Sequence, residues 1–249
     1  MIEIYDTSLI LWIAIAFLTL LTLLKIPAPY GKFTNNRWGK LINARLGWFI
    51  MEIISPIGLL FFALNGPTNK STATWIFLAL WTLHYLNRSI IYPLRQINPH
   101  PMPISIAIFA FIFNIFNGFF NGFYLGNIRE YPSDYIFEPN FIFGSILFMI
   151  GAIINIKSDN ILLRVRAEKN GYHIPHGFMY RYISFPNYFG EILEWIAFAI
   201  MTWSLAGLSF AIWTIANLGP RALKGHQWYK EKFKEEYPSN RKAIIPKIL

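Results

Sequence analysis

Residues 187–195 read Asn187-Tyr188-Phe189-Gly190-Glu191-Ile192-Leu193-Glu194-Trp195, and they open an apolar run that continues to Leu205. Glu191 and Glu194 are three residues apart, so on a helix they share one face, and Asn187 extends this polar stripe by one turn. A charged carboxylate at membrane depth costs at least about 2.5 kcal/mol, so such residues normally line a cavity or face a partner. The stretch therefore predicts a membrane helix beside a polar pocket. The alternative is a set of interfacial residues at a helix start, where anionic side chains suit the helix dipole.

The whole chain has the composition of an integral membrane protein. Its 249 residues are 55% hydrophobic and 14% charged, whereas a typical soluble domain is about 25% charged. The absence of cysteine excludes disulfides, thiolate metal sites and a thiol nucleophile. The net charge of +9 is spread over loops between apolar runs, so nucleic acid is not an expected partner.

Seven apolar segments predict an all-α fold of seven transmembrane helices in a single domain. They are residues 8–24, 46–64, 72–91, 103–125, 141–156, 188–205 and 206–219. Several are shorter than the ~20 residues that span a bilayer comfortably, so we expect tilted helices or different ends. The first segment follows Glu3 and Asp6 and lacks a small-residue cleavage site, which predicts a retained helix and not a signal peptide.

The basic residues predict the orientation in the membrane. Of the 22 Lys and Arg residues, 20 lie after the first, third and fifth segments and in the tail, Lys169 among them. Cytoplasmic loops accumulate Lys and Arg. We therefore expect the N-terminus outside and the C-terminus in the cytosol.

The fourth segment carries one stripe of glycines and one stripe of side-chain amides. Three glycines recur every four residues, a spacing that lets another helix approach closely: Gly118, Gly122 and Gly126. Three amides lie on a neighbouring stripe and need partners in lipid: Asn114, Asn117 and Asn121. We expect these amides to bond other helices or to line a cavity.

Two polar clusters are expected on the cytosolic side. Asn155, Asp159 and Arg166 share one face of a predicted helix, and an acidic group beside a guanidinium suits a ribose and a phosphate, although surface helices also carry such pairs. A second cluster combines cationic, stacking and hydroxyl groups: Arg221, His226, Trp228 and Tyr229. An anionic aromatic ligand that enters from the cytosol would meet both clusters.

Glu52 and Tyr85 are polar residues inside apolar segments. A carboxylic acid that an apolar site keeps protonated can donate a hydrogen bond, and so can a tyrosine hydroxyl. Together they could polarise a carbonyl oxygen, although Tyr85 alone would also fit a core aromatic.

Familiar cofactor and metal motifs are absent from the sequence. There is no glycine-rich dinucleotide fingerprint, Walker loop or His-Glu-x-x-His helix. His173 and His176 flank Pro175 without a nearby third ligand, so no metal site is expected.

Several motifs resemble those of the steroid 5α-reductase family, over nearly the full chain. The most specific are Asn155-Ile156-Lys157-Ser158-Asp159, Tyr172-His173-Ile174-Pro175-His176-Gly177, residues 187–195, and the tail from Tyr229 through Tyr237-Pro238, Arg241-Lys242 and Pro246. The N-terminal matches are Tyr30-Gly31-Lys32, Ala44-Arg45, Trp48-Phe49 with Glu52, and Leu83-His84-Tyr85 with Arg88. Related membrane reductases and isoprenylcysteine-type methyltransferases resemble the C-terminal pieces alone.

The resemblance implies a seven-helix membrane enzyme that uses NADPH to reduce the conjugated double bond of a 3-oxosteroid. It assigns the ketone oxygen to Glu52 and Tyr85, and Trp48 to the steroid lining. It surrounds the dinucleotide with Asn155, Asp159, Arg166, Tyr172, Asn187, Glu191, Arg221 and Tyr229. Residues 1–125 would then be mainly substrate-side helices and residues 126–249 mainly the cofactor-binding region. The expected partners are the lipid bilayer and a hydrophobic steroid-like substrate, with no obligatory protein partner.

Three positions depart from the family pattern, and they bear on which substrate is preferred. Met51 stands where mammalian members carry glutamine, Phe109 where the family has an arginine, and Gly225 within a stretch that is otherwise histidine-rich. The first two are expected to touch the substrate pocket.

Three other functions stay open at this point. One is a reductase on the same scaffold that acts on an enoyl-CoA or a sterol double bond. Another is a methyltransferase that uses S-adenosylmethionine on isoprenylcysteine or lipid, although that family has Arg-His-Pro where Ser184-Phe185-Pro186 stands. The third is a non-enzymatic sterol-binding protein. In each case we expect an integral membrane protein, in the inner membrane of a bacterium or the endoplasmic reticulum of a eukaryote, with any cofactor site facing the cytosol.

Overall fold

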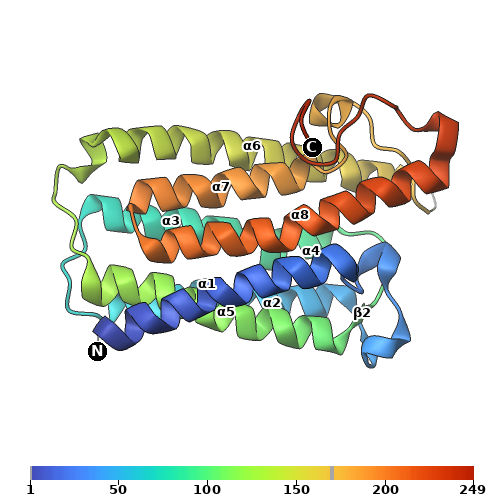
Figure 1. The fold of residues 1–249 in the computed structure, drawn as a ribbon. Helices are drawn as coiled ribbons and strands as arrows, with labels where there is room; N and C mark the ends of the chain where they lie inside the picture. Colours follow the sequence, from blue (N-terminus) through green and yellow to red (C-terminus); the bar gives the residue numbers. More distant parts are fainter. Residues whose placement is uncertain (1, 169–170) are drawn as a thin grey trace. The chain divides into compact units, whose positions relative to one another are not determined.

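The described residues of the computed structural model, 2–168 and 171–249, are mainly helical (Figure 1). Lys169, one of the basic residues counted above, lies outside the described residues. The chain packs as two compact units. Unit 1 holds the residues up to Leu9 together with Ala28–Ile142, and unit 2 holds Ile10–Pro27 and Phe143–Leu249. The boundaries fall inside helices α1 (Ile2–Lys25) and α6 (Pro139–Glu168), so both helices contribute to both units.

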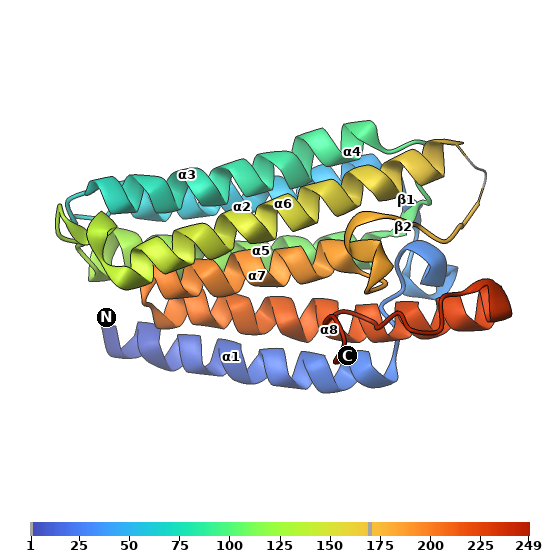
Figure 2. The ribbon, with the colours of Figure 1, turned by 90° about the horizontal axis from the view of Figure 1, so that it is seen from above.

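Unit 1 is built on α2 (Ala44–Leu64), α3 (Thr72–Leu86) and α5 (Ile104–Phe123), which run alongside one another (Figure 2). The Asn43 side chain accepts hydrogen bonds from two backbone amides at the start of α2, and the Ser71 side chain accepts one, from the amide of Thr74, at the start of α3. α2 and α5 pack closely, since a Cβ on any of the three glycines of the fourth predicted segment would lie 3.0 Å or less from a backbone oxygen of α2. The predicted close helix approach is confirmed.

Two π-helical turns extend the helices of unit 1. η3 (Asn87–Ile91) and α4 (Tyr92–Arg95) continue α3, and η4 (Tyr124–Ile128) continues α5. Such turns change the direction of side chains and are frequent at functional sites. The strands β1 (Leu41–Ile42) and β2 (Met102–Pro103) pair antiparallel, with Leu41 opposite Pro103, and tie the segment before α2 to the start of α5.

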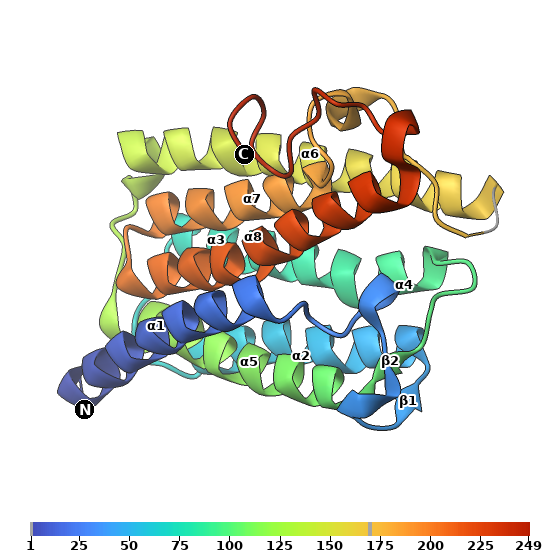
Figure 3. The same ribbon diagram turned by 45° about the vertical axis from the view of Figure 1, so that its right-hand side comes forward.

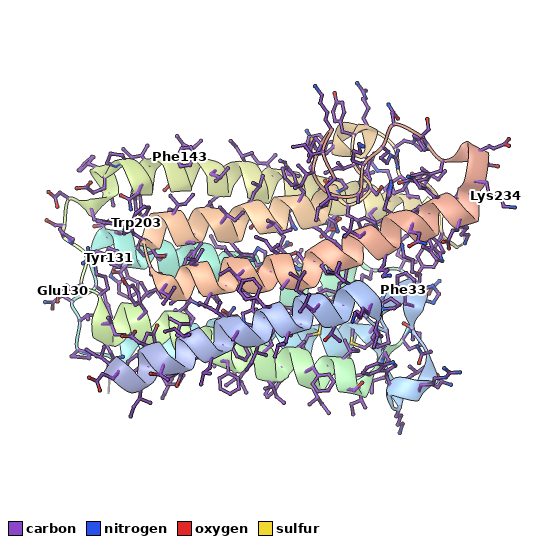
Figure 4. All side chains as sticks on the ribbon, viewed as in Figure 1. Phe33, Glu130, Tyr131, Phe143, Trp203 and Lys234 are labelled. Carbon is purple, nitrogen blue, oxygen red and sulfur yellow. The ribbon has the colours of Figure 1, made fainter. Side chains whose placement is uncertain are left out.

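Unit 2 is built on α6, α7 (Pro186–Thr202) and α8 (Leu205–Phe233), which also run side by side (Figures 1 and 2). Trp203, which is 74% exposed with a φ of 45°, makes the turn between α7 and α8 (Figure 4). After α8 the chain returns to the segment before α7 (Figure 3), where the amide of Ser184 donates to the carbonyl of Lys242 at 2.9 Å. Short 3₁₀ turns complete the fold: η1 (Gly31–Phe33), η2 (Asn36–Trp38), η5 (Tyr135–Phe137), η6 (Phe178–Arg181) and η7 (Lys234–Glu236).

Four helices of the described chain are long and apolar enough to cross a membrane: Ile2–Lys25, Ala44–Leu64, Ile104–Ile128 and Pro139–Glu168. Large apolar side chains on them are exposed, such as Leu18, Phe61 and Phe143, each at least 59% exposed. Figure 4 shows Phe143 pointing outward from α6. This surface fits an integral membrane protein, because lipid tails replace a protein partner.

The other predicted spans lie on α3, α7 and α8, which differ from these four helices in length or polarity. α3 has 15 residues and α7 has 17, which is less than the ~20 residues that cross a bilayer comfortably. α6 and α8 continue well beyond the predicted ends at residues 156 and 219, because their polar turns stay helical where the apolar pattern stops. The seven-span count and the orientation stay predictions.

Candidate active site

The ring of Tyr85 has a fixed place in unit 1. Tyr85 is 4% exposed on α3, and Trp81 of the preceding turn stacks on it with ring centroids 5.6 Å apart. The indole Nε1 of Trp81 donates to the Ser55 hydroxyl of α2 at 3.2 Å. Tyr85 is therefore held by a residue that is itself anchored to the neighbouring helix.

The hydroxyl of Tyr85 is held by Asn114 of α5. It donates to Asn114 Oδ1 at 3.1 Å, and Asn114 Nδ2 donates to the carbonyl of Met51 at 2.6 Å. Asn114 is 2% exposed. The expectation that this amide bonds other helices is confirmed.

Glu52 follows Met51 on α2 and is partly buried. Pro56 lies four residues further along the helix and has no N–H, so it cannot donate to the backbone carbonyl of Glu52. The hydrogen-bond ladder of α2 therefore lacks one donor at the backbone of Glu52. Of the two departures expected near the substrate, Met51 belongs to this cluster through its backbone, whereas Phe109 is 60% exposed and lies outside the buried cluster.

Trp48 lies in an aromatic cluster around a buried guanidinium. Its Nε1 donates to the Tyr30 hydroxyl at 2.7 Å, and the Arg88 guanidinium carbon lies 4.7 Å from the ring centroid of Trp48 and 5.0 Å from that of Tyr92. Arg88 is 8% exposed. No site role is assigned to Arg88 or Tyr92 from the sequence. The charge of Arg88 inside the apolar segment 72–91 is the sequence signal that indicates this cluster.

In unit 2, two glycines let α6 and α7 approach. A Cβ on Gly190 would lie 2.5 Å from the amide nitrogen of Asn155, and one on Gly151 would lie 2.7 Å from the carbonyl of Gly190. The approach places Asn155 Nδ2 3.0 Å from the carbonyl of Asn187, and Asn187 Nδ2 2.9 Å from Asp159 Oδ1. Three residues predicted to bind the dinucleotide are therefore one buried hydrogen-bonded group.

The same contacts argue against helix capping by the polar stripe of α7. Phe185 stands at the N-cap and makes no side-chain hydrogen bond, and the Asn187 amide bonds α6 instead. Glu194 is 2% exposed within the helix, and Glu191 is partly buried one turn after Asn187. This stripe faces protein and not the membrane interface.

Arg166, Tyr172 and Tyr229 form a second group in unit 2. Burial raises the pKa of Tyr229 to about 12 and also raises the pKa of Tyr172, and in both cases the positive charge of Arg166 opposes the rise. Arg166 itself is exposed near the end of α6. The Tyr229 ring stacks on Phe233 and Tyr237, with centroids 5.8 and 5.6 Å away.

Several buried polar atoms of unit 2 make no hydrogen bond within the described part of the chain. They include Ser158 Oγ, Asn160 Oδ1, Asn187 Oδ1 and Arg221 Nε. Buried polar atoms normally have partners. The amide oxygens can accept from ribose hydroxyls, and the guanidinium can donate to a phosphate, so these residues fit a dinucleotide. No group of three or more His, Asp and Glu residues within 2–168 and 171–249 could hold a metal ion.

His226 contacts both the segment before α7 and the chain that follows α8. Its Nδ1 lies 2.6 Å from the hydroxyl of Ser184, which is also 2.5 Å from the Tyr237 hydroxyl and donates to the carbonyl of Lys242 at 3.0 Å. Burial lowers the pKa of His226 to about 4, with help from nearby positive charges. The imidazole is therefore neutral near pH 7. Local sequence did not reveal this role, because its partners are more than 10 residues away.

Apolar helices that enclose such polar groups define the class of this protein as an integral membrane protein. A family model described as 3-oxo-5-alpha-steroid 4-dehydrogenase matches residues 100–249. Steroid 5-alpha-reductase DET2 of Gossypium hirsutum is 37% identical over 256 residues, covering 100% of this chain and 95% of that protein. 3-oxo-5-alpha-steroid 4-dehydrogenase 1 of Rattus norvegicus is 36% identical over 237 residues, covering 94% and 91%. The chain belongs to the 3-oxo-5-alpha-steroid 4-dehydrogenase family of oxidoreductases, as the sequence motifs had predicted.

Proposed function

We propose that the protein reduces the conjugated carbon–carbon double bond of a 3-oxo-Δ4-steroid with NADPH, and gives the 5α-reduced 3-oxosteroid. Membership of the family supports double-bond reduction in a steroid. The observation that carries the site assignment is the buried Tyr85 hydroxyl, which is held by Asn114 in the same unit as Glu52.

Glu52 and Tyr85 are assigned to the ketone oxygen of the steroid. NADPH, when bound, would supply a hydride to the β-carbon of the enone. The two side chains would then stabilise the negative charge that develops on the ketone oxygen, and a proton would reach the α-carbon. Trp48 is assigned to the lining of the steroid site.

The dinucleotide is assigned to unit 2, which supplies both kinds of group that it needs. Asn155, Asp159, Asn187 and Glu191 offer amide and carboxylate groups to the ribose hydroxyls, while Arg166 and Arg221 offer guanidinium groups to the phosphates. Tyr172 and Tyr229 contribute aromatic surface and hydroxyls. The unpartnered Asn187 Oδ1 and Arg221 Nε support this assignment.

Seven spans, with the N-terminus outside and the C-terminus in the cytosol, complete the proposal. The asymmetric placement of Lys and Arg supports this orientation. It puts the dinucleotide groups on the side where NADPH is available, in a bacterial inner membrane or the endoplasmic reticulum.

The test is turnover by detergent-purified protein with NADPH that carries deuterium on C4 of the nicotinamide, and progesterone as substrate. The expected product is 5α-reduced and carries one deuterium on C5. Glu52→Gln and Tyr85→Phe should lower turnover far more than NADPH affinity. Tyr131→Phe, at another buried tyrosine of unit 1, is the matched control and should leave turnover unchanged. NADPH binding without steroid reduction would refute the substrate assignment, and S-adenosylmethionine binding in its place would favour a methyltransferase.

A further inference from the structure

The strongest unassigned feature is a ring of contacts that closes around Tyr85 through three helices. Met51 and Ser55 lie one turn apart on α2, and Trp81 and Tyr85 lie one turn apart on α3. Asn114 of α5 joins the two ends, since it bonds both Met51 and Tyr85. All five residues are at most 6% exposed.

The orientation of the Asn114 side-chain amide follows from the hydrogen bond that its NH₂ group donates. The NH₂ group bonds the carbonyl of Met51 at 2.6 Å, and a carbonyl oxygen can only accept. The amide oxygen therefore faces the Tyr85 hydroxyl and must be an acceptor there. A tyrosine hydroxyl has a single proton, so Asn114 determines where that proton points.

We infer that Asn114 is a positioning residue: it holds the Tyr85 hydroxyl in place, and the hydroxyl turns its proton from Asn114 Oδ1 to the carbonyl oxygen of a bound substrate. The inference rests on the proposed role of Tyr85. A ketone oxygen at this site would compete with Asn114 Oδ1 for the same proton. Asn114 therefore controls both the place of the hydroxyl and how readily its proton is offered to the substrate.

Asn114→Leu is the first test, because it removes both hydrogen bonds and nearly preserves side-chain size. The expected result is a fall of roughly tenfold in kcat, the kinetic equivalent of one hydrogen bond, with little change in the KM for NADPH. Asn117→Leu is the matched control. Asn117 is 0% exposed on the same helix, and its Nδ2 makes no hydrogen bond within the described residues. An Asn114→Leu enzyme with wild-type kcat would overturn the inference.

A double variant separates positioning from a general structural effect. In the Tyr85→Phe background there is no hydroxyl to position, so adding Asn114→Leu should leave kcat unchanged. If the two losses multiply instead, Asn114 does not act through Tyr85.

Asn114→Asp supplies a readout that packing alone would not change. A protonated carboxyl can donate to Met51 and accept from Tyr85, whereas a carboxylate has lost the donor. The kcat of this variant, divided by that of the wild type at the same pH, should therefore exceed the value for Asn114→Leu at low pH and decline as pH rises; the division removes the titration of Glu52, which both proteins share. A pH profile parallel to that of the wild type would contradict the inference.

A spectroscopic readout keeps the contact testable if the protein turns over no steroid. In protein labelled with 3-fluorotyrosine, the ¹⁹F resonance of residue 85 is identified by its loss in Tyr85→Phe. It should shift in Asn114→Leu and stay in place in Asn117→Leu. An unshifted resonance would refute the contact itself, whereas a shifted one in a protein without reductase activity would refute only the proposed function.

Discussion

Asn187→Ala tests the hydrogen bonds that join α6 to α7. The substitution removes the amide that donates to Asp159 Oδ1 at 2.9 Å, and it leaves a carboxylate that is 4% exposed without this donor. Hydrogen bonds to charged groups contribute about 1.5–3 kcal/mol. The bond from Asn155 to the Asn187 carbonyl is to the backbone, so it survives the substitution.

The assay is thermal unfolding of the detergent-solubilised protein without cofactor. For a chain of this size, 1 kcal/mol corresponds to roughly 2–4 °C, so the expected loss in Tm is about 3–12 °C. The matched control is Asn160→Ala, which removes an amide whose buried Oδ1 has no hydrogen-bond partner in the described chain. Its Tm should change much less.

Equal losses of Tm for Asn187→Ala and Asn160→Ala would refute the reasoning, because burial and not the hydrogen bond would then decide stability. Adding NADPH supplies a second comparison. A ligand that binds only the folded state raises its stability, by about 2.7 kcal/mol at a concentration 100 times its Kd. If Asn187 contacts the dinucleotide as proposed, Asn187→Ala should show a smaller rise in Tm than the wild type.

Three further predictions concern single contacts. Gly190→Ala should lower the free energy of unfolding by about 1–3 kcal/mol in thermal or denaturant unfolding, because its Cβ would lie 2.5 Å from a backbone atom of α6. Gly219→Ala is its control, since that Cβ meets nothing within 4 Å, and it should not destabilise. Because the pKa of His226 is lowered to about 4 in the folded protein, the unfolded chain binds more protons between about pH 4 and 6.5. Stability should therefore fall as pH drops through this window, and Tm measured against pH should be flatter for His226→Gln; parallel profiles would contradict this. Trp48→Phe removes the donor to the Tyr30 hydroxyl and should lower the free energy of unfolding by about 1 kcal/mol, whereas an unchanged Tm would show that water replaces the bond.

Much of the helical framework was predictable, because hydropathy is a local property. The predicted segments 46–64 and 103–125 match α2 and α5 within two residues at each end. α6 and α8 are longer than the sequence predicts. The apolar pattern ends where each helix leaves its apolar surroundings, whereas the backbone hydrogen bonds continue beyond that point. The π turn at Asn87–Ile91 was not foreseen, because the residues that form it are equally compatible with an α-helix.

The candidate site was predictable as a set of residues and not as a set of contacts. Glu52 and Asn187 stand out because polar groups are costly in or beside apolar segments, and Asp159 stands out because it shares a helix face with Arg166. The bond between Asn187 and Asp159 joins residues 28 positions apart, and no local pattern encodes it. The sequence groups His226 with Trp228 and Tyr229, but its contacts with Ser184 and Tyr237 appear only in the tertiary structure.

The sequence by itself determined that this is a helical membrane protein of the 3-oxo-5-alpha-steroid 4-dehydrogenase family, since composition, hydropathy and motif spacing are properties of the chain. Only the tertiary structure decided which way the Asn114 amide faces, and therefore where the single proton of Tyr85 points. The physical reason is that a hydrogen bond forms only within about 3 Å and along a defined direction. That geometry exists only after α2, α3 and α5 have packed against one another.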